Sequence, residues 1–477
     1  MAAAAEQGQV KIIRDAVSDF ANRYVDSPTA AEKAFMRSHY FQFRGYAPFH
    51  DRALSWGPPS TFYLDLYAIY RNYDTDDGKQ LLADHPDWVL HDASGKRLYI
   101  PFACEGGSCP QYAADITNPA FRKWWIDRAK AIAVRGYAGL YIDDVNMEMM
   151  VGNGNGDLVA PIDRATGRPM TEAVWRSYVT QFADQVKREM PGYPITHNSG
   201  QWWVSHDDPS YQREVQAAST IELERGFSQD GLDDGTGKFG FRTYLKHVDW
   251  LHSMGDSVVV QPYDLDPQLA EFELASYYLV NDGEDAIATD YRTDPDNWWR
   301  GWETDLGAAH GPRYAWQGVI RRDFDNGFVL VNPPEASTRT VDLGGSYQRL
   351  DGSSAGTLTL GETRGAVLLG TPPAGGEAPH GDEQLAQTIG TATVAVRVQP
   401  KRRALKRVVP VIAQISLSSR RAGHWVTVRK ARVRIAHRGR FQKRFRRLPA
   451  GHYRATVRRL THRPVRVLLH RHRIVVS

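Results

Sequence analysis

Short runs of β-favouring apolar residues alternate with amphipathic stretches of helical length along residues 10–290. Apolar runs of this length predict strands, and a 3.6-residue period predicts helices. The predicted strands are Tyr40–Phe43, Thr61–Tyr67, Asp87–Leu90 or slightly later, Gly139–Asp143, Ile195–Asn198, Thr220–Glu224, Ser257–Pro262 and Ala286–Asp290. The predicted helices are Val10–Tyr24, Pro119–Val134, Thr171–Met190, Phe239–Met254 and Pro267–Val280.

Strand–helix units repeated over roughly 250 residues predict a parallel sheet, and about eight of them predict a closed (β/α)8 TIM barrel. We therefore expect an α/β fold with a catalytic barrel at residues 1–312. An open doubly wound sheet is the alternative, but no Gly-rich phosphate-binding loop follows the first predicted strand.

The pattern changes near Tyr314, where short strands are separated by turn sequences. This pattern predicts a small β-sandwich accessory domain at residues 313–370. Residues 371–384, TPPAGGEAPHGDEQ, have the composition of a flexible linker. Alternating Val and Arg residues then predict a basic all-β module at 385–477, a β-sandwich of the immunoglobulin or fibronectin type.

Charge is divided unevenly between these parts. No Asp or Glu occurs from Gln384 onward, where 25 of the 59 Lys and Arg residues lie. Residues 1–383 therefore hold 34 basic and all 55 acidic side chains, a net charge of −21. This asymmetry predicts different partners for the two parts. We expect the basic module to bind an anionic cell-wall polymer. Nucleic acid is the less favoured partner, because no nucleic-acid-binding motif accompanies the Arg residues.

Cys104 and Cys109 are the only cysteines. Their short, Gly-containing spacing favours a disulfide, with two free thiols as the alternative, and two thiols alone make a poor zinc site. A disulfide indicates an oxidising compartment, so we expect an extracellular or cell-surface protein. Residues 1–9 lack the features of a signal peptide, and no apolar run is long enough to span a membrane.

Carboxylates follow several predicted strands, and catalytic side chains of TIM barrels lie at the carboxyl ends of strands. Asp143 and Asp144 end the fourth predicted strand, and Glu222 and Glu224 share one face of the sixth. Glycoside hydrolysis needs one carboxyl group as acid and a second as nucleophile or base. We predict Asp143 as nucleophile or base and Glu224 as acid, with Asp144 and Glu222 as alternatives.

Polar and aromatic residues near the same strand ends are candidates for substrate binding. Exposed Trp rings can stack on sugar rings, although packing at the rim is the alternative for each pair. The candidates are Asp65, Tyr67, Asn146, His197, Asn198, Trp202, Trp203, Tyr263, Asp264, Asp290 and Trp298. We expect neither a metal ion nor an organic cofactor.

Three segments carry a family resemblance: HPDWVLHDASGK at 85–96, ADITNPAFRKWWIDRA at 114–129 and GYAGLYIDDVN at 136–146. They resemble TIM-barrel glycosyl hydrolases related to the α-galactosidase superfamily and to endo-α-1,4-polygalactosaminidases. The resemblance covers roughly residues 35–370 and implies an active-site Asp at the end of the fourth strand. Asp143 matches it most directly, although Asp144 can be aligned there as well, and Glu222 stays open beside Glu224.

The sequence therefore predicts a glycoside hydrolase that cleaves O-glycosidic bonds of a polysaccharide or cell-surface glycan with two carboxyl groups. The alternative is a non-catalytic carbohydrate-binding barrel tethered to an anionic cell surface. The separation of the two carboxyl groups discriminates between these hypotheses.

Overall fold

The structure is a computed structural model of the chain. It describes residues 6–16, 24–71, 77–199, 201–229, 231–263, 267–289 and 298–372, and also 389–400, 411–421, 424–435, 439–449, 451–459, 465–469 and 473–476. The chain divides into two compact units, Met1–Ala378 and Pro379–Ser477.

Eight parallel strands close into a barrel in the first unit. In spatial order the barrel runs β1-β10-β9-β8-β7-β6-β3-β2, and β2 pairs with β1 to close it. The strands are β1 (Ile12–Ala16), β2 (Gln42–Gly45), β3 (Ser60–Asp65), β6 (Gly139–Asp143), β7 (Ile195–Asn198), β8 (Thr220–Glu224), β9 (Ser257–Gln261) and β10 (Ala286–Ala288). The predicted TIM barrel is confirmed, and the predicted bounds of β6, β7 and β8 match the structure.

The start of the barrel differs from the sequence-based prediction. The helix predicted at Val10–Tyr24 is wrong at its beginning, because Ile12–Ala16 is barrel strand β1. Ile12 faces the main core, whereas Ile13 lies in a small cluster with Val259. Both faces of β1 are thus buried, and periodicity does not separate a fully buried strand from a helix.

The strand predicted at Asp87–Leu90 is also wrong. Residues Pro86–Trp88 form a short 3-10 helix, preceded by α4 (Asp77–Asp84). This segment belongs to the long connection between β3 and β6, which also contains the antiparallel pair β4 (Ala68–Tyr70) and β5 (Gln111–Ala113). Cys104 and Cys109 form a disulfide in the same connection, as predicted.

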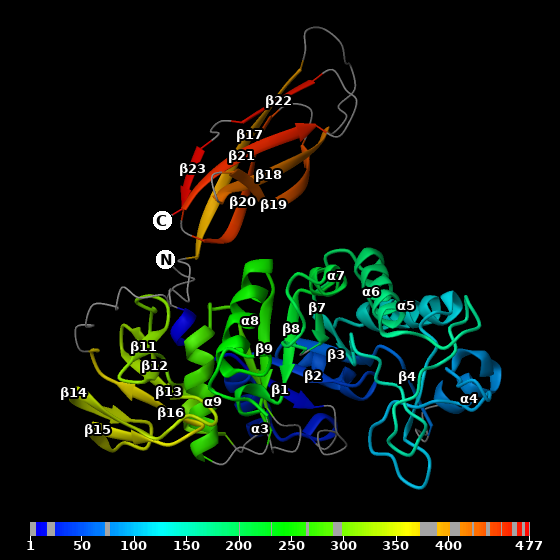
Figure 1. Cartoon of the computed structure of the whole chain (residues 1–477), viewed down its shortest axis with the longest axis horizontal. Helices are drawn as coiled ribbons and strands as arrows, with labels where there is room; N and C mark the ends of the chain where they lie inside the picture. Colours follow the sequence, from blue (N-terminus) through cyan, green and yellow to red (C-terminus); the bar gives the residue numbers. More distant parts are fainter. Residues whose placement is uncertain are drawn as a thin grey trace. The chain divides into compact units, whose positions relative to one another are not determined.

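Helices surround the barrel strands, and Figure 1 shows α5, α6 and α7 side by side outside β3, β6 and β7. Asn118 caps α5 by accepting the N–H of Ala120, with Pro119 in the first turn. The main helices are α3 (Ala30–His39), α5 (Pro119–Ala133), α6 (Glu172–Glu189), α7 (Pro209–Ala217), α8 (Phe241–Met254) and α9 (Pro267–Val280). None of the helices in the described ranges combines the length and apolarity that crossing a membrane requires.

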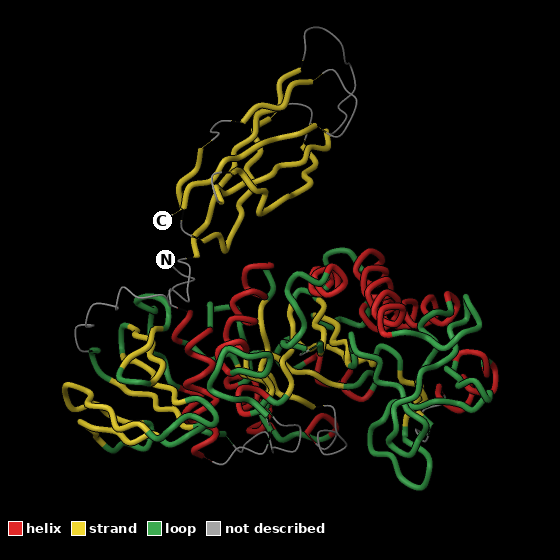
Figure 2. The backbone as a smooth tube through the Cα atoms, viewed as in Figure 1, coloured by secondary structure: helices red, strands yellow, loops and turns green. Residues whose placement is uncertain are grey.

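After the barrel, six antiparallel strands form one sheet in the order β11-β12-β13-β16-β14-β15. Figure 2 shows these strands as a layer beside the helices of the barrel, and β13 and β16 contact α9. The strands predicted for residues 313–370 are present and hydrogen-bonded in one sheet, and the β-sandwich arrangement stays a prediction. The strands are β11 (Tyr314–Trp316), β12 (Val319–Phe324), β13 (Gly327–Asn332), β14 (Arg339–Arg349), β15 (Ser354–Leu360) and β16 (Arg364–Leu369).

The second unit consists of antiparallel strands in its described ranges. They form a three-stranded sheet, β20-β17-β22, and a four-stranded sheet, β19-β18-β21-β23. The immunoglobulin-like or fibronectin-like type stays a prediction, as do the four domain boundaries. The strands are β17 (Ile389–Pro400), β18 (Val411–Arg421), β19 (His424–Ile435), β20 (Gly439–Pro449), β21 (Gly451–Arg459), β22 (Val465–Leu469) and β23 (Arg473–Val476).

Candidate active site

The barrel interior changes from apolar to polar along the strands. Ile13, Val259, Ala286 and Ala288 form a small apolar cluster, and charged residues follow towards the carboxyl ends. Since side chains alternate along a strand, every second residue points inward. The inward positions at the carboxyl ends carry the predicted catalytic candidates.

Asp143 at the end of β6 and Glu224 at the end of β8 are held by the same amide. Nδ2 of Asn198 on β7, the strand between them, donates to Oδ1 of Asp143 at 2.8 Å and to Oε2 of Glu224 at 2.9 Å. These two oxygens can be no farther apart than the two bonds together, about 5.7 Å. The barrel thus brings the two leading candidates to one place.

Asp143 accepts two further hydrogen bonds. Tyr63 on β3 donates its hydroxyl to Oδ2 at 2.5 Å, and the backbone N–H of Asp144 donates to Oδ1 at 2.9 Å. Burial raises the pKa of Asp143, and the charge of Glu224 raises it further, while the bonds from Tyr63, Asn198 and Asp144 act in the opposite direction. This carboxyl group is firmly oriented at the end of its strand.

Glu224 has a more open setting. Its side chain is exposed at the rim, and Oε1 accepts the hydroxyl of Tyr263 at 2.7 Å. Tyr263 and Asn198 therefore hold one carboxylate oxygen each. Exposure lets the group exchange protons with water, which an acid that acts in every cycle needs.

Glu222 occupies a different environment, although it shares a face of β8 with Glu224. It is fully buried, accepts a bond from Arg44 on β2, and accepts the Tyr141 hydroxyl at 2.9 Å. Arg44 also binds Oδ2 of Asp15 on β1 at 2.8 Å. Burial raises the pKa of Glu222 to about 7, although Arg44 opposes this shift. Both carboxylate oxygens are occupied inside the barrel, below the rim.

Asp144 points towards the end of β3 rather than towards Glu224. Its Oδ1 accepts Nδ2 of Asn146 at 2.8 Å, and its side chain is hydrogen-bonded to Asp65. Asn146 also donates to the hydroxyl of Tyr67 at 3.1 Å. Four predicted residues, Asp65, Tyr67, Asp144 and Asn146, thus form one group beside Asp143.

The tryptophan pair that follows β7 lies in a loop cluster. Trp202 is buried and donates to Gln229, whereas Trp203 is half-buried and donates its Nε1 to Glu148 at 2.9 Å. Phe239, nearly half exposed, packs against both rings. Trp203 is therefore the better placed of the two to meet a ligand.

Two of the predicted binding residues do not fit that role. His197 is fully buried, and its Nδ1 lies 2.7 Å from Glu214 of α7, so it faces the helix layer. Trp298 packs against Phe35 of α3 and Tyr40, which precedes β2. That contact is at the amino end of β2, opposite the carboxyl ends that carry the candidates. Asp264 and Asp290 lie outside the described residues.

A group of potential metal ligands, His252, Asp282 and Asp285, lies before β9 and β10, at the amino ends of the strands. Nε2 of His252 lies 2.9 Å from Oδ1 of Asp285, which also accepts the N–H of Val258. These side chains therefore connect α8 to the amino ends of β9 and β10. The catalytic candidates lie at the opposite, carboxyl ends of the strands.

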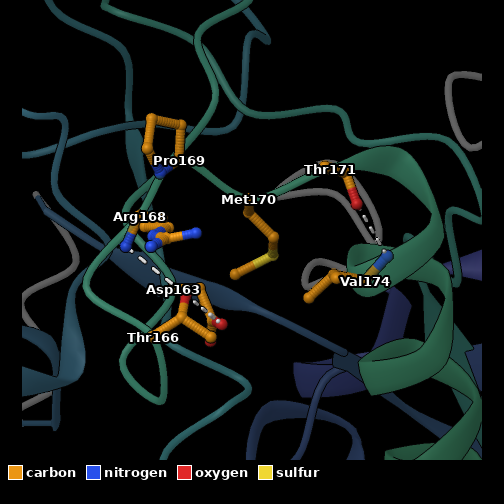
Figure 3. A pocket seen from close by; sticks show the side chains of 7 residues that line it. All are labelled: Asp163, Thr166, Arg168, Pro169, Met170, Thr171 and Val174. Carbon is orange, nitrogen blue, oxygen red and sulfur yellow. Dashed lines mark hydrogen bonds between the residues drawn. The ribbon is translucent and has the colours of Figure 1, made fainter.

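A hollow of about 410 Å³ lies in the long connection between β6 and α6. Figure 3 shows its lining, with Asp163 and Thr166 on one side and Thr171 and Val174 at the start of α6. Asp163 accepts bonds from the N–H of Ala165 and the hydroxyls of Thr166 and Tyr178. Both oxygens of the Asp163 carboxylate therefore accept hydrogen bonds from residues around the loop.

Comparison with known proteins places the chain among glycosyl hydrolases. The model of "Hypothetical glycosyl hydrolase family 15" matches residues 61–328, more than half of the chain and all of the barrel from β3 onward. The chain belongs to this family. It is accordingly a glycosidase, and the matched region contains every predicted catalytic residue.

Among solved structures, the chain is similar to the glycoside hydrolase domain of PelA from Pseudomonas aeruginosa, with 18% identity, a TM-score of 0.35, and coverage of 59% of this chain and 95% of that one. It is also similar to an alpha-galactosidase from Thermus thermophilus, with 14% identity, a TM-score of 0.42, and coverage of 66% and 65%. No curated protein sequence matches the chain.

Sequence reasoning missed several residues that shape the site of this family member. Arg44 holds Glu222 and is itself bound by Asp15, and Tyr63 holds Asp143. Asp15 was hidden because β1 was predicted as a helix. The sequence signal was the charged pair Arg14 and Asp15 directly after the apolar pair Ile12 and Ile13. Such a change from apolar to charged residues is typical of a strand that enters a polar barrel interior.

Proposed function

We propose that the chain hydrolyses O-glycosidic bonds of a polysaccharide or cell-surface glycan with retention of anomeric configuration. Asp143 acts as the nucleophile and Glu224 as the acid and base. The observation that carries the proposal is the amide of Asn198, which bonds both carboxylates and limits their bonded oxygens to about 5.7 Å. Retaining enzymes hold their carboxyl groups about 5–5.5 Å apart, and inverting enzymes about 6.5–9.5 Å apart.

The hydrogen bonds support this assignment of roles. A nucleophile must be oriented and ionised, and Asp143 accepts three donors on its two oxygens. An acid must regain its proton from water in each cycle, and Glu224 is the exposed member of the pair. Glu222 is set aside because both its oxygens are bound inside the barrel.

The reaction then proceeds in two steps. Oδ of Asp143 attacks the anomeric carbon, the bond to the leaving oxygen breaks, and Glu224 gives that oxygen its proton. In the second step Glu224 takes a proton from water, the water oxygen attacks the anomeric carbon, and the bond to Asp143 breaks. Asn198 touches both carboxylates and keeps them aligned through both steps.

The same separation argues against a carbohydrate-binding barrel without catalysis. A binding module needs polar contacts to a sugar but has no requirement for two carboxylates at this spacing. Trp203 and Phe239, beside the rim loops, supply the aromatic surface that either protein would use, so they do not discriminate between the two.

The first test uses Asp143→Asn and Glu224→Gln. We expect each to lower kcat by about a thousand-fold or more on a glycan that the wild type cleaves, with an unchanged fold by circular dichroism. Glu189→Gln, on the exposed end of α6, removes an equal charge and serves as the control. Near wild-type rates in both variants contradict the assignment.

Azide separates the two roles. In Asp143→Gly, azide fills the place of the nucleophile, and we expect a glycosyl azide of inverted configuration. In Glu224→Ala, azide attacks the glycosyl-enzyme, and we expect a glycosyl azide of retained configuration. NMR of the products measures the anomeric configuration directly. The opposite configuration for either variant would make Glu224 the nucleophile and Asp143 the acid and base.

A further inference from the structure

Asp65 is a buried carboxyl group that the two-step reaction does not use. It ends β3 directly beside Asp143, its partner in the register of β3 and β6. Oδ1 accepts the N–H groups of Tyr67 at 2.8 Å and of Ala68 at 2.7 Å. Oδ2 is buried, and no N–H or O–H donor of the described residues reaches it. The two backbone bonds therefore fix which oxygen is left without a donor.

The side chain of Asp65 is hydrogen-bonded to the carboxyl group of Asp144. Ionised carboxylates are acceptors only, so a hydrogen bond between two of them requires a proton on one. Asp144 also accepts Nδ2 of Asn146 at 2.8 Å. One proton between Asp65 and Asp144 satisfies the oxygen that otherwise has no donor.

Asp144 has a backbone conformation that needs support. Its φ is 56°, in the left-handed region that non-glycine residues seldom adopt. That conformation aims its N–H at Oδ1 of Asp143, at 2.9 Å. The contacts of the Asp144 side chain thus hold a hydrogen bond to the nucleophile.

We propose that Asp65 is a positioning residue, which shares one proton with Asp144 and thereby fixes the N–H that Asp144 donates to Asp143. The role in catalysis rests on the proposed function, whereas the shared proton is a property of the folded protein alone. Loss of the proton places two negative charges in contact, and their repulsion moves Asp144 and its N–H.

The surroundings favour the protonated pair. The ionisable groups that face it are Asp143 on β6, Glu224 on β8, Tyr63 on β3, Tyr67 after β3 and Tyr70 on β4, all of them acids. Burial raises the pKa of Asp65 well above its usual range, and it raises the pKa of Asp144 to about 7 with a contribution from Asp143. The pair therefore keeps a proton at pH values where a free carboxyl group has already lost it.

Asp65→Asn is the matched test because Oδ1 can keep both backbone bonds while Nδ2 donates permanently to Asp144. With an aryl glycoside whose leaving group needs no acid, so that Glu224 does not set the alkaline limb, we expect wild-type kcat to fall as pH rises through the raised pKa at which the pair loses its proton. In Asp65→Asn this alkaline limb moves up by at least about one pH unit. A limb at the wild-type pH overturns the positioning role.

Thermal unfolding tests the proton without any substrate. An unfolded carboxyl group releases this proton at about pH 4, and the folded pair, whose pKa is raised, releases it at a higher pH. The pair therefore lowers wild-type stability as pH rises between the two values. Asp65→Asn has no such proton. We expect its Tm, relative to wild type, to rise steadily from pH 4 to pH 8, and a constant difference overturns the shared proton. Asp144→Asn supplies the same replacement from the other side if Asp65→Asn does not fold.

Asp163→Asn is the control with the opposite sign. Burial acts to raise the pKa of Asp163, but bonds from Thr166, Ala165 and Tyr178 lower it. Its Tm relative to wild type should fall as pH rises towards about 4 and stay constant from pH 4 to pH 8, and the alkaline limb of kcat should stay in place. If the wild type cleaves no glycan, the proposed function fails, while the Tm series still decides the shared proton.

Discussion

At the residue scale, Asn198 is the link between the two carboxylates. It lies on β7, between the strands of Asp143 and Glu224, and each of its two amide hydrogens can serve one carboxylate. The sequence predicts Asn198 near a ligand, because it ends a strand. It does not predict the bridge, because that depends on how three neighbouring strands align.

Charge coupling between Asp143 and Glu224 gives a prediction for pH dependence. The charge of an ionised Glu224 helps to raise the pKa of Asp143. In Glu224→Gln that charge is absent, so we expect the pKa of the Asp143 carboxyl group in the free enzyme to be lower than in the wild type. An NMR titration of the carboxyl carbons measures it. An unmoved pKa, or an equal shift in the Glu189→Gln control, contradicts the coupling.

At the scale of strands and helices, the sequence predicts elements well where apolar runs end in turns. The bounds of β6, β7, β8 and α9 follow from such runs. Prediction fails for β1, because Arg14 and Asp15 belong to a strand whose charges are buried. Arg44, the partner of Asp15, lies on another strand, and local sequence does not show which distant charge neutralises this carboxylate.

The buried ion group that joins three strands gives a prediction for stability. Arg44 of β2 binds Asp15 of β1 and Glu222 of β8. Arg44→Leu removes the cation that these two buried carboxyl groups share, and we expect a loss of about 3–5 kcal/mol in the free energy of unfolding at pH 7. The loss should be smaller at pH 5, because the carboxyl groups can then take up protons.

Urea unfolding at the two pH values measures this effect, and Arg52→Leu is the control. Arg52 pairs with Asp26 at the surface, where both side chains are more than half exposed. A surface pair of this kind contributes little to stability. Equal losses for Arg44→Leu at pH 5 and pH 7 contradict the electrostatic explanation.

At the scale of the whole molecule, the division of charge indicates two tasks. The barrel and its sheet form one unit, and the strands from β17 onward form another. We propose that the basic module at residues 385–477, with 25 Lys and Arg residues and no acidic ones, holds the enzyme on an anionic cell-wall polymer. The part that precedes it, with a net charge of −21 over residues 1–383, is repelled by the same polymer. An extracellular or cell-surface location is part of this proposal.

Binding to an anionic polymer releases counterions, so it weakens steeply as salt rises. We therefore expect the full chain to be retained on anionic cell-wall material at low ionic strength and released at high ionic strength. A chain that ends near Gly381 should not be retained, yet it should cleave a soluble glycan at the wild-type rate because the barrel is complete. Equal retention of both chains contradicts tethering. A faster truncated enzyme indicates instead that the basic unit covers the acidic barrel, and equal rates with salt-dependent retention support a tether that concentrates the glycosidase beside its substrate.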